Sequence, residues 1–166
     1  GVEVSKTLFY HKQYEYAILI LKKFLEEPDG WIENKLNSCL VLSCCYQAMG
    51  ENAAAFDILF YSFTMDVPRA EICCEIGRLF MEKREYVTAA YWYQQALLAP
   101  RKKKNGGFYI ADSHDFIPAI QMCVCLDKAG RHREAFEFHK KARVLKPLHQ
   151  AVIGNEKYFR DVWGME

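Results

Sequence analysis

The segment Tyr86–Pro100, YVTAAYWYQQALLAP, decides the fold of this chain. It places two small residues, Ala89 and Ala96, seven positions apart in an aromatic-rich run that stops at a proline. Two antiparallel helices approach to about 8–10 Å only where a small side chain faces the partner helix, and larger residues then fill the flanking holes. The two alanines therefore predict a helix that packs closely on another. We expect Trp92 and Tyr93 to pack between helices, in preference to forming the aromatic wall of a ligand site.

Related segments occur three more times along the chain. Each carries an alanine at the position of Ala89 and ends in a proline, and they cover residues 12–28, 50–68 and 130–147. The corresponding alanines are Ala17, Ala55 and Ala135. A second helical pattern precedes each of the last three copies. Internal repetition of this kind predicts an array of helix pairs.

The pattern resembles the tetratricopeptide repeat (TPR), a helix pair of about 34 residues with small residues at fixed positions and a proline near its end. The last copy is the best match: Cys123, Ala135 and Ala142 take the small positions and Pro147 takes the terminal one. Stacked repeats bury apolar faces that one repeat alone leaves exposed. The resemblance therefore implies an all-α, TPR-like solenoid of about four helix pairs.

We expect one helical-repeat domain over residues 1–166, closed by a C-terminal capping helix. The last segment has an apolar stripe without a second helix to match it, as capping helices do. The predicted parts are repeats at approximately 1–28, 31–68, 69–100 and 115–147, an insertion loop at 101–114 and the capping helix at 148–163.

The composition excludes several classes of function. The 22 Lys+Arg and 21 Asp+Glu residues leave a net charge of +1, which argues against a nucleic-acid partner or a polybasic membrane anchor. No run reaches the roughly 18 apolar residues that a membrane span needs, and the first residues lack the apolar core of a secretion signal. We therefore expect a cytoplasmic protein.

The seven cysteines support the same location. Their number is odd and none forms a C-x-x-C pair, so neither a disulfide framework nor a zinc site is indicated. Free cysteine is among the most frequently buried residue types. We expect these cysteines to behave as small buried hydrophobic residues.

The segment 101–118, which includes the insertion loop, departs from the repeat pattern. It begins with the basic run Arg101–Lys104 and later carries Asp112, His114 and Asp115. A solvated loop tip is the simpler interpretation of the basic run, and contact with phosphate groups is the alternative. The Asp-x-His-Asp cluster offers few ligands for a divalent metal and no partner motif, so we expect no metal site.

Catalytic motifs are missing from the sequence. It has no G-x-S-x-G, no P-loop, no H-E-x-x-H and no glycine-rich dinucleotide turn. We expect no catalytic, cofactor-binding or metal-binding residue in this chain.

Residues 115–159 also resemble the TPR region that follows the catalytic domain in some bacterial family 2 glycosyltransferases. The generic repeat does not require Gln121, the run Cys123–Cys125, or the ending formed by Asn155, Tyr158 and Phe159, and these carry the resemblance. It implies that the chain, which begins with a glycine, is the C-terminal part of a transferase. The nucleotide sugar and divalent metal would then bind a catalytic domain outside this sequence. The repeats would hold the acceptor or join two subunits.

The alternative is a free-standing adaptor that binds a peptide in its concave groove. Repeat positions indicate ten groove candidates: Asn37, Leu40, Gln47, Glu71, Arg78, Met81, Ile120, Val124, Asp127 and Lys128. A clamp for acidic peptide termini needs Lys and Asn at positions that Cys44, Arg78 and Val124 occupy here, so we expect no such clamp. A mixed apolar groove is better suited to self-association, for example as a homodimer, or to an extended apolar acceptor.

Overall fold

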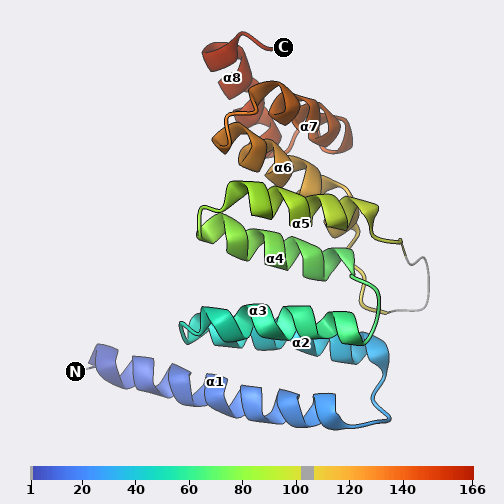
Figure 1. Cartoon of the computed structure of the whole chain (residues 1–166). Coiled ribbons are helices and arrows are strands. Elements are labelled where there is room, and N and C mark those ends of the chain that lie inside the picture. The colour runs from blue at the N-terminus through green and yellow to red at the C-terminus, as the bar shows by residue number, and fades with distance from the viewer. Residues whose placement is uncertain (1, 102–106) are drawn as a thin grey trace. The chain divides into compact units, whose positions relative to one another are not determined.

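The computed structural model describes residues 2–101 and 107–166, and all regular structure in these residues is helical (Figure 1). The α-helices are α1 (Val2–Glu26), α2 (Ile32–Ala48), α3 (Asn52–Tyr61), α4 (Ala70–Glu82), α5 (Tyr86–Leu98), α6 (Phe116–Lys128), α7 (His132–Leu145) and α8 (Gln150–Trp163). Two short 3-10 helices are η1 (Ser62–Thr64) and η2 (Ala111–His114). The all-α prediction is confirmed. None of the helices in the described part of the chain combines the length and apolar character that crossing a bilayer requires.

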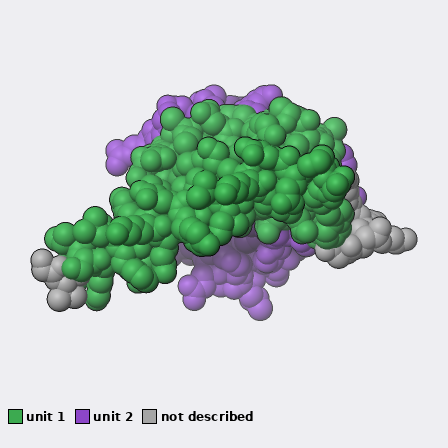
Figure 2. All heavy atoms as spheres, turned by 90° about the horizontal axis from the view of Figure 1, so that it is seen from below, with its two compact units in different colours: residues 1–67, 104–108 green, residues 68–103, 109–166 purple. Residues whose placement is uncertain are grey.

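The chain divides into two compact units (Figure 2). Unit 1 comprises residues 1–67 and 104–108 and contains α1, α2, α3 and η1. Unit 2 comprises residues 68–103 and 109–166 and contains the remaining helices. A single repeat domain over the whole chain stays a prediction.

Unit 1 is built from the α2–α3 pair and the long helix α1, which packs on α2. Its core contains Leu25 from α1 and Cys39 and Leu42 from α2, all buried. The first predicted repeat, 1–28, contains one helix instead of a pair. The reason is local: neither glycine nor proline interrupts residues 2–27, so a helix that begins at Val2 continues to Glu26.

Unit 2 contains two helix pairs, α4–α5 and α6–α7, followed by α8. A loop and η2 separate the pairs, and Asp115 caps the start of α6 by accepting a hydrogen bond from the Phe116 N–H at 2.6 Å. Met122, Cys123 and Leu126 of α6 join residues of the other helices in one continuous core.

The turns inside the three helix pairs share one geometry. Two residues after the end of each first helix lies a residue with positive φ: Gly50 (75°), Arg84 (59°) and Gly130 (82°). The backbone N–H of the next residue donates to the carbonyl of the residue five positions before that donor. These hydrogen bonds run from Glu51 to Tyr46, from Glu85 to Phe80 and from Arg131 to Leu126, at 2.8–3.0 Å. This is the hydrogen bond of a Schellman ending, which satisfies a carbonyl left free by the helix. Arg84 adopts a backbone conformation that normally favours glycine.

Small residues permit the close approach of α4 and α5. Ala89 and Ala96 have no exposed surface, and Tyr93 is 1% exposed. The ring of Tyr93 lies against Gly77 of α4 so closely that a Cβ placed there would be 2.8 Å from the ring. The segment 86–100 therefore forms a packing surface, as its alanines predict, and burial raises the pKa of the Tyr93 hydroxyl.

Six of the seven cysteines are buried, and only Cys44 is exposed. Burial raises the pKa of the Cys39 thiol to about 11 and those of Cys73, Cys123 and Cys125 to about 12. At neutral pH these thiols stay protonated and chemically inert. The expectation that the cysteines act as small apolar residues holds for all but Cys44.

Gly77→Ala is expected to destabilise the protein by about 1–3 kcal/mol, because the buried Tyr93 ring has no room to move. The matched control is Gly154→Ala in α8, where an added Cβ meets nothing within 4 Å. This control substitution is expected to stabilise the protein by about 0.5–1 kcal/mol, because alanine has a higher helix propensity than glycine. Urea unfolding of both variants measures the difference. Equal effects of the two substitutions would contradict close packing at Gly77.

Candidate protein-interaction surfaces

The groove candidates on α4 and α6 differ in exposure. Glu71 and Ile120 are buried, Arg78, Met81, Val124 and Asp127 are half-buried, and Lys128 is exposed. Oε1 of Glu71 lies 3.3 Å from Nε2 of His114 in η2, inside unit 2. Glu71 and Ile120 therefore hold the unit together and offer no surface to a ligand.

Arg78 forms ion pairs with residues of its own helix. Its guanidinium contacts Glu75 and Glu82 of α4, each at 2.5 Å. Both pairs are between residues three or four apart on one helix face. The positive charge of Arg78 is thus compensated locally, which weakens any role in binding an anion.

Asp127 attaches α8 to the helix pair before it. Its carboxylate accepts a hydrogen bond from the Tyr158 hydroxyl at 2.7 Å and lies 2.6 Å from Nδ1 of His132. The Trp163 indole N–H donates to the same hydroxyl at 3.1 Å, and its ring stacks on His132 at 3.8 Å. The sequence places Asp127 in a groove, whereas in the structure it links α6, α7 and α8.

The remaining candidates lie on α2, in unit 1. Asn37 is exposed, and Leu40 and Gln47 are half-buried. The side-chain amide of Gln47 donates to the Ser43 hydroxyl at 3.1 Å. Leu40 and Asn37 thus stay available as surface residues of unit 1, and a groove that continues into unit 2 stays a prediction.

The acidic and histidine residues of the segment 101–118 contact three different partners. Asp112 pairs with Lys146 at 2.6 Å, His114 contacts Glu71, and Asp115 caps α6. In the described ranges, no three His, Cys, Asp or Glu residues gather in a way that suits a metal ion. The basic run, apart from Arg101, lies outside the described residues. Arg101 itself pairs with Asp115 at 3.0 Å.

Helix α8 is held on α7 by a buried histidine. His139 has no exposed surface, and its ring contacts those of Phe136 and Phe159. Its Nε2 is hydrogen-bonded to the carboxylate of Glu156 on α8, which also accepts from Arg143 at 2.7 and 2.9 Å. The hydrogen bond from His139, followed by the charge of Arg143, holds the pKa of Glu156 below its usual range.

The outer face of α1 is an exposed apolar helix surface of unit 1. The inner face packs on α2 through Ile18, Leu21 and Leu25. At 100° per residue, a second apolar stripe lies on the opposite side. This outer α1 face consists of Leu8, Phe9, Tyr16, Leu19 and Ile20, which are 47–66% exposed. The N-terminal turns of α1 extend beyond α2 and α3 (Figure 1).

The repeat pattern predicts a repeat over residues 1–28 whose apolar residues are buried by stacking, so it assigns no role to the outer α1 face. The signal was present in the sequence. Apolar residues at 8, 9, 16, 19 and 20, together with those at 18, 21 and 25, cover two opposite sides of one helix.

No family model and no curated protein sequence matches the chain. The fold is similar to solved structures of MamA. MamA AMB-1 aligns with a TM-score of 0.65 and 18% identity over 96% of this chain and 80% of that one, and MamA MSR-1 with 0.62 and 19% over 96% and 84%. Another crystal structure of MamA gives 0.61 and 23% over 89% and 81%. These likenesses show a TPR-like fold and do not support the glycosyltransferase link.

Glu156→Gln is expected to lower the free energy of unfolding at pH 7 by about 1–2 kcal/mol, because it weakens a charge-assisted hydrogen bond. Since the folded-state pKa of Glu156 is depressed, its contribution is present above pH 4.5 and is lost as the pH falls through the lower folded value. The variant therefore loses less stability than the wild type on acidification. Chemical unfolding at several pH values measures this.

The matched control is Glu137→Gln, which removes a surface ion pair with Lys140 on α7. Exposed pairs of this kind contribute about 0–1 kcal/mol. An effect of Glu156→Gln no larger than that of the control would show that Glu156 does not hold α8.

Proposed function

We propose that this chain is a non-catalytic TPR-like domain that binds protein, and that it pairs with a second copy of itself through the outer α1 face. One observation carries the proposal: five large apolar side chains share one exposed helix face. Contiguous exposed apolar surface of this size marks an interaction site on a folded protein.

The order of residues along the outer α1 face suits an antiparallel pair of α1 helices. A two-fold axis near residue 14 sets Leu8 opposite Ile20 and Phe9 opposite Leu19 of the second copy. The same register sets Lys12 opposite Tyr16, where an ammonium over an aromatic ring is attractive. A two-fold interface requires this self-complementarity, because each contact occurs twice.

The area available agrees with a modest affinity. The exposed parts of five large apolar side chains amount to about 500–600 Å² per copy, so that a pair buries about 1,000–1,200 Å², near the lower limit of specific interfaces. We therefore expect a dimer that forms at micromolar concentration and dissociates on dilution.

Charge substitutions on α1 test this pairing. Wild-type protein is expected to double its mass from 19.4 kDa as its concentration rises, and Leu8→Glu combined with Ile20→Glu is expected to stay monomeric. Val87→Glu is the control, because Val87 is 64% exposed on α5 in unit 2. Sedimentation velocity gives the mass and circular dichroism checks the fold. A wild-type monomer at high concentration would overturn the proposal.

Glycosyltransferase parentage is a further proposal, and only the sequence resemblance at 115–159 supports it. In such a parent the self-pairing proposed for α1 would join two enzyme subunits. The repeats would otherwise hold the acceptor. The reading frame upstream of residue 1 tests it: a catalytic domain with a D-x-D carboxylate motif supports the parentage. An upstream frame that encodes only further repeats favours the free-standing adaptor that binds a peptide.

Cytoplasmic location is likewise a proposal. Its support is that the seven cysteines form no disulfide, since an oxidising compartment favours disulfide formation at exposed thiols such as that of Cys44. Fractionation of cells that express the full-length protein tests the location.

A further inference from the structure

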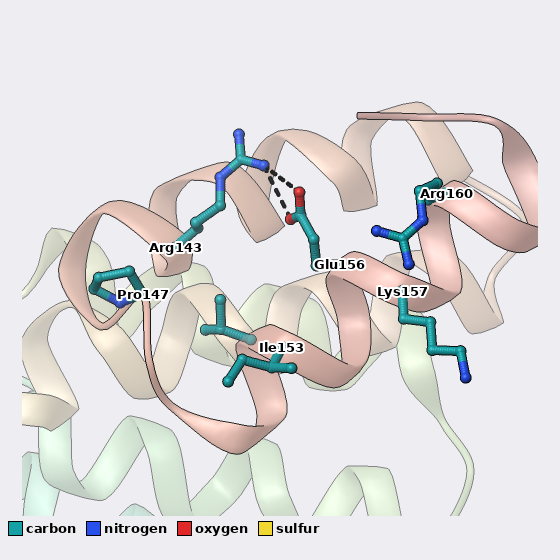
Figure 3. Close-up of a pocket in the computed structure, with 7 residues that line it drawn as sticks. Arg143, Pro147, Ile153, Glu156, Lys157 and Arg160 are labelled. Atoms are coloured by element: carbon teal, nitrogen blue, oxygen red, sulfur yellow. Dashed lines mark hydrogen bonds and ion pairs between the residues drawn. The ribbon is translucent and has the colours of Figure 1, made fainter.

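A cavity of about 290 Å³ lies between the C-terminal end of α7 and helix α8 (Figure 3). Pro147, Val152 and Ile153 form its apolar floor. Val152 is buried, whereas Ile153 is exposed, so the floor is open to a side chain that enters from solvent. This cavity belongs wholly to unit 2 and shares no residue with the outer α1 face.

The rim of the cavity is positively charged. Arg143, Lys157 and Arg160 stand around it, with Glu156 as the one carboxylate. Within the part of the chain that is described, Lys157 has no ion-pair partner, and Arg160 reaches only Asp161, at 3.4 Å. The rim thus has an excess of two positive charges and at least one ammonium group available to a ligand.

Glu156 positions Arg143 without exhausting its donors. Both carboxylate oxygens of Glu156 accept from one nitrogen of Arg143, Nη1, and the dashed lines in Figure 3 mark these contacts. The other guanidinium nitrogens, Nε and Nη2, have no partner among the described residues. Because buried His139 is hydrogen-bonded to Glu156, the carboxylate holds the Arg143 side chain at the rim before any ligand binds. Preorganised donors of this kind lose less entropy on binding.

We propose that this cavity binds a short acidic–aliphatic segment of a partner protein. An aliphatic side chain of the partner rests on Pro147 and Ile153, and carboxylates of neighbouring Asp or Glu residues accept hydrogen bonds from Arg143 and, separately, from Lys157. Guanidinium and ammonium groups recognise carboxylates in this way. The apolar floor and the small volume favour one or two side chains of a peptide over a bare anion, which gains nothing from the floor.

A capped hexapeptide, Ala-Leu-Glu-Leu-Glu-Ala, serves as the probe, with its glutamine counterpart as the matched control ligand. Titration into isotopically labelled full chain is followed by amide chemical shifts, which detect weak binding and locate it. The glutamate peptide is expected to shift amides at the end of α7 and along α8. The glutamine peptide is expected to bind at least tenfold more weakly, and added salt is expected to weaken only the glutamate peptide.

Charge reversal at the rim completes the test. Lys157→Glu combined with Arg160→Glu is expected to weaken binding of the glutamate peptide at least tenfold. The matched control is Arg131→Glu combined with Arg133→Glu, which makes the same charge change at exposed residues of unit 2 outside the cavity.

Three results would overturn the proposal. They are equal affinity for the two peptides, equal loss in the rim and control variants, and tighter binding of inorganic phosphate or anionic vesicles than of the glutamate peptide. Failure of α1 to pair leaves these readouts unchanged, because the outer α1 face lies in the other unit.

Discussion

Close approach of two helices at buried small residues is the constraint on which the helix pairs depend. In the α4–α5 pair, the space left by Gly77 is filled by Tyr93, and Ala89 and Ala96 keep the second helix close. Ala135 and Ala142 are equally buried in the α6–α7 pair. Close approach buries the apolar faces, and the shared turn geometry fixes the direction in which each second helix returns.

The sequence predicts the helix pairs because their determinants are local and periodic. The spacing of Ala89 and Ala96 and the cap at Asp115 each act within a few residues. The candidate groove is less predictable because its members find partners far along the chain. Glu71 meets a histidine 43 residues away, and Asp127 meets a tyrosine 31 residues away. Repeat position indicates which side of a helix a residue occupies, and it does not show whether a loop or terminal helix covers that side.

The residues that carry the family resemblance close the end of unit 2. Tyr158 bonds to Asp127, Phe159 is buried beside His139, and the Asn155 amide lies 3.8 Å from the Cys123 sulfur. These contacts explain the Asn, Tyr and Phe pattern as a way to dock a terminal helix. In this chain the three residues therefore act in packing.

The distribution of the cysteines has a practical consequence. Because Cys44 alone is exposed, a maleimide dye added to the folded protein should mark α2 at one position. The buried thiols on α4 and α6, such as Cys73 and Cys125, react only when their surroundings open. The rate at which each becomes modified therefore reports how often its helix pair separates, so the chain carries built-in reporters of local unfolding in unit 2.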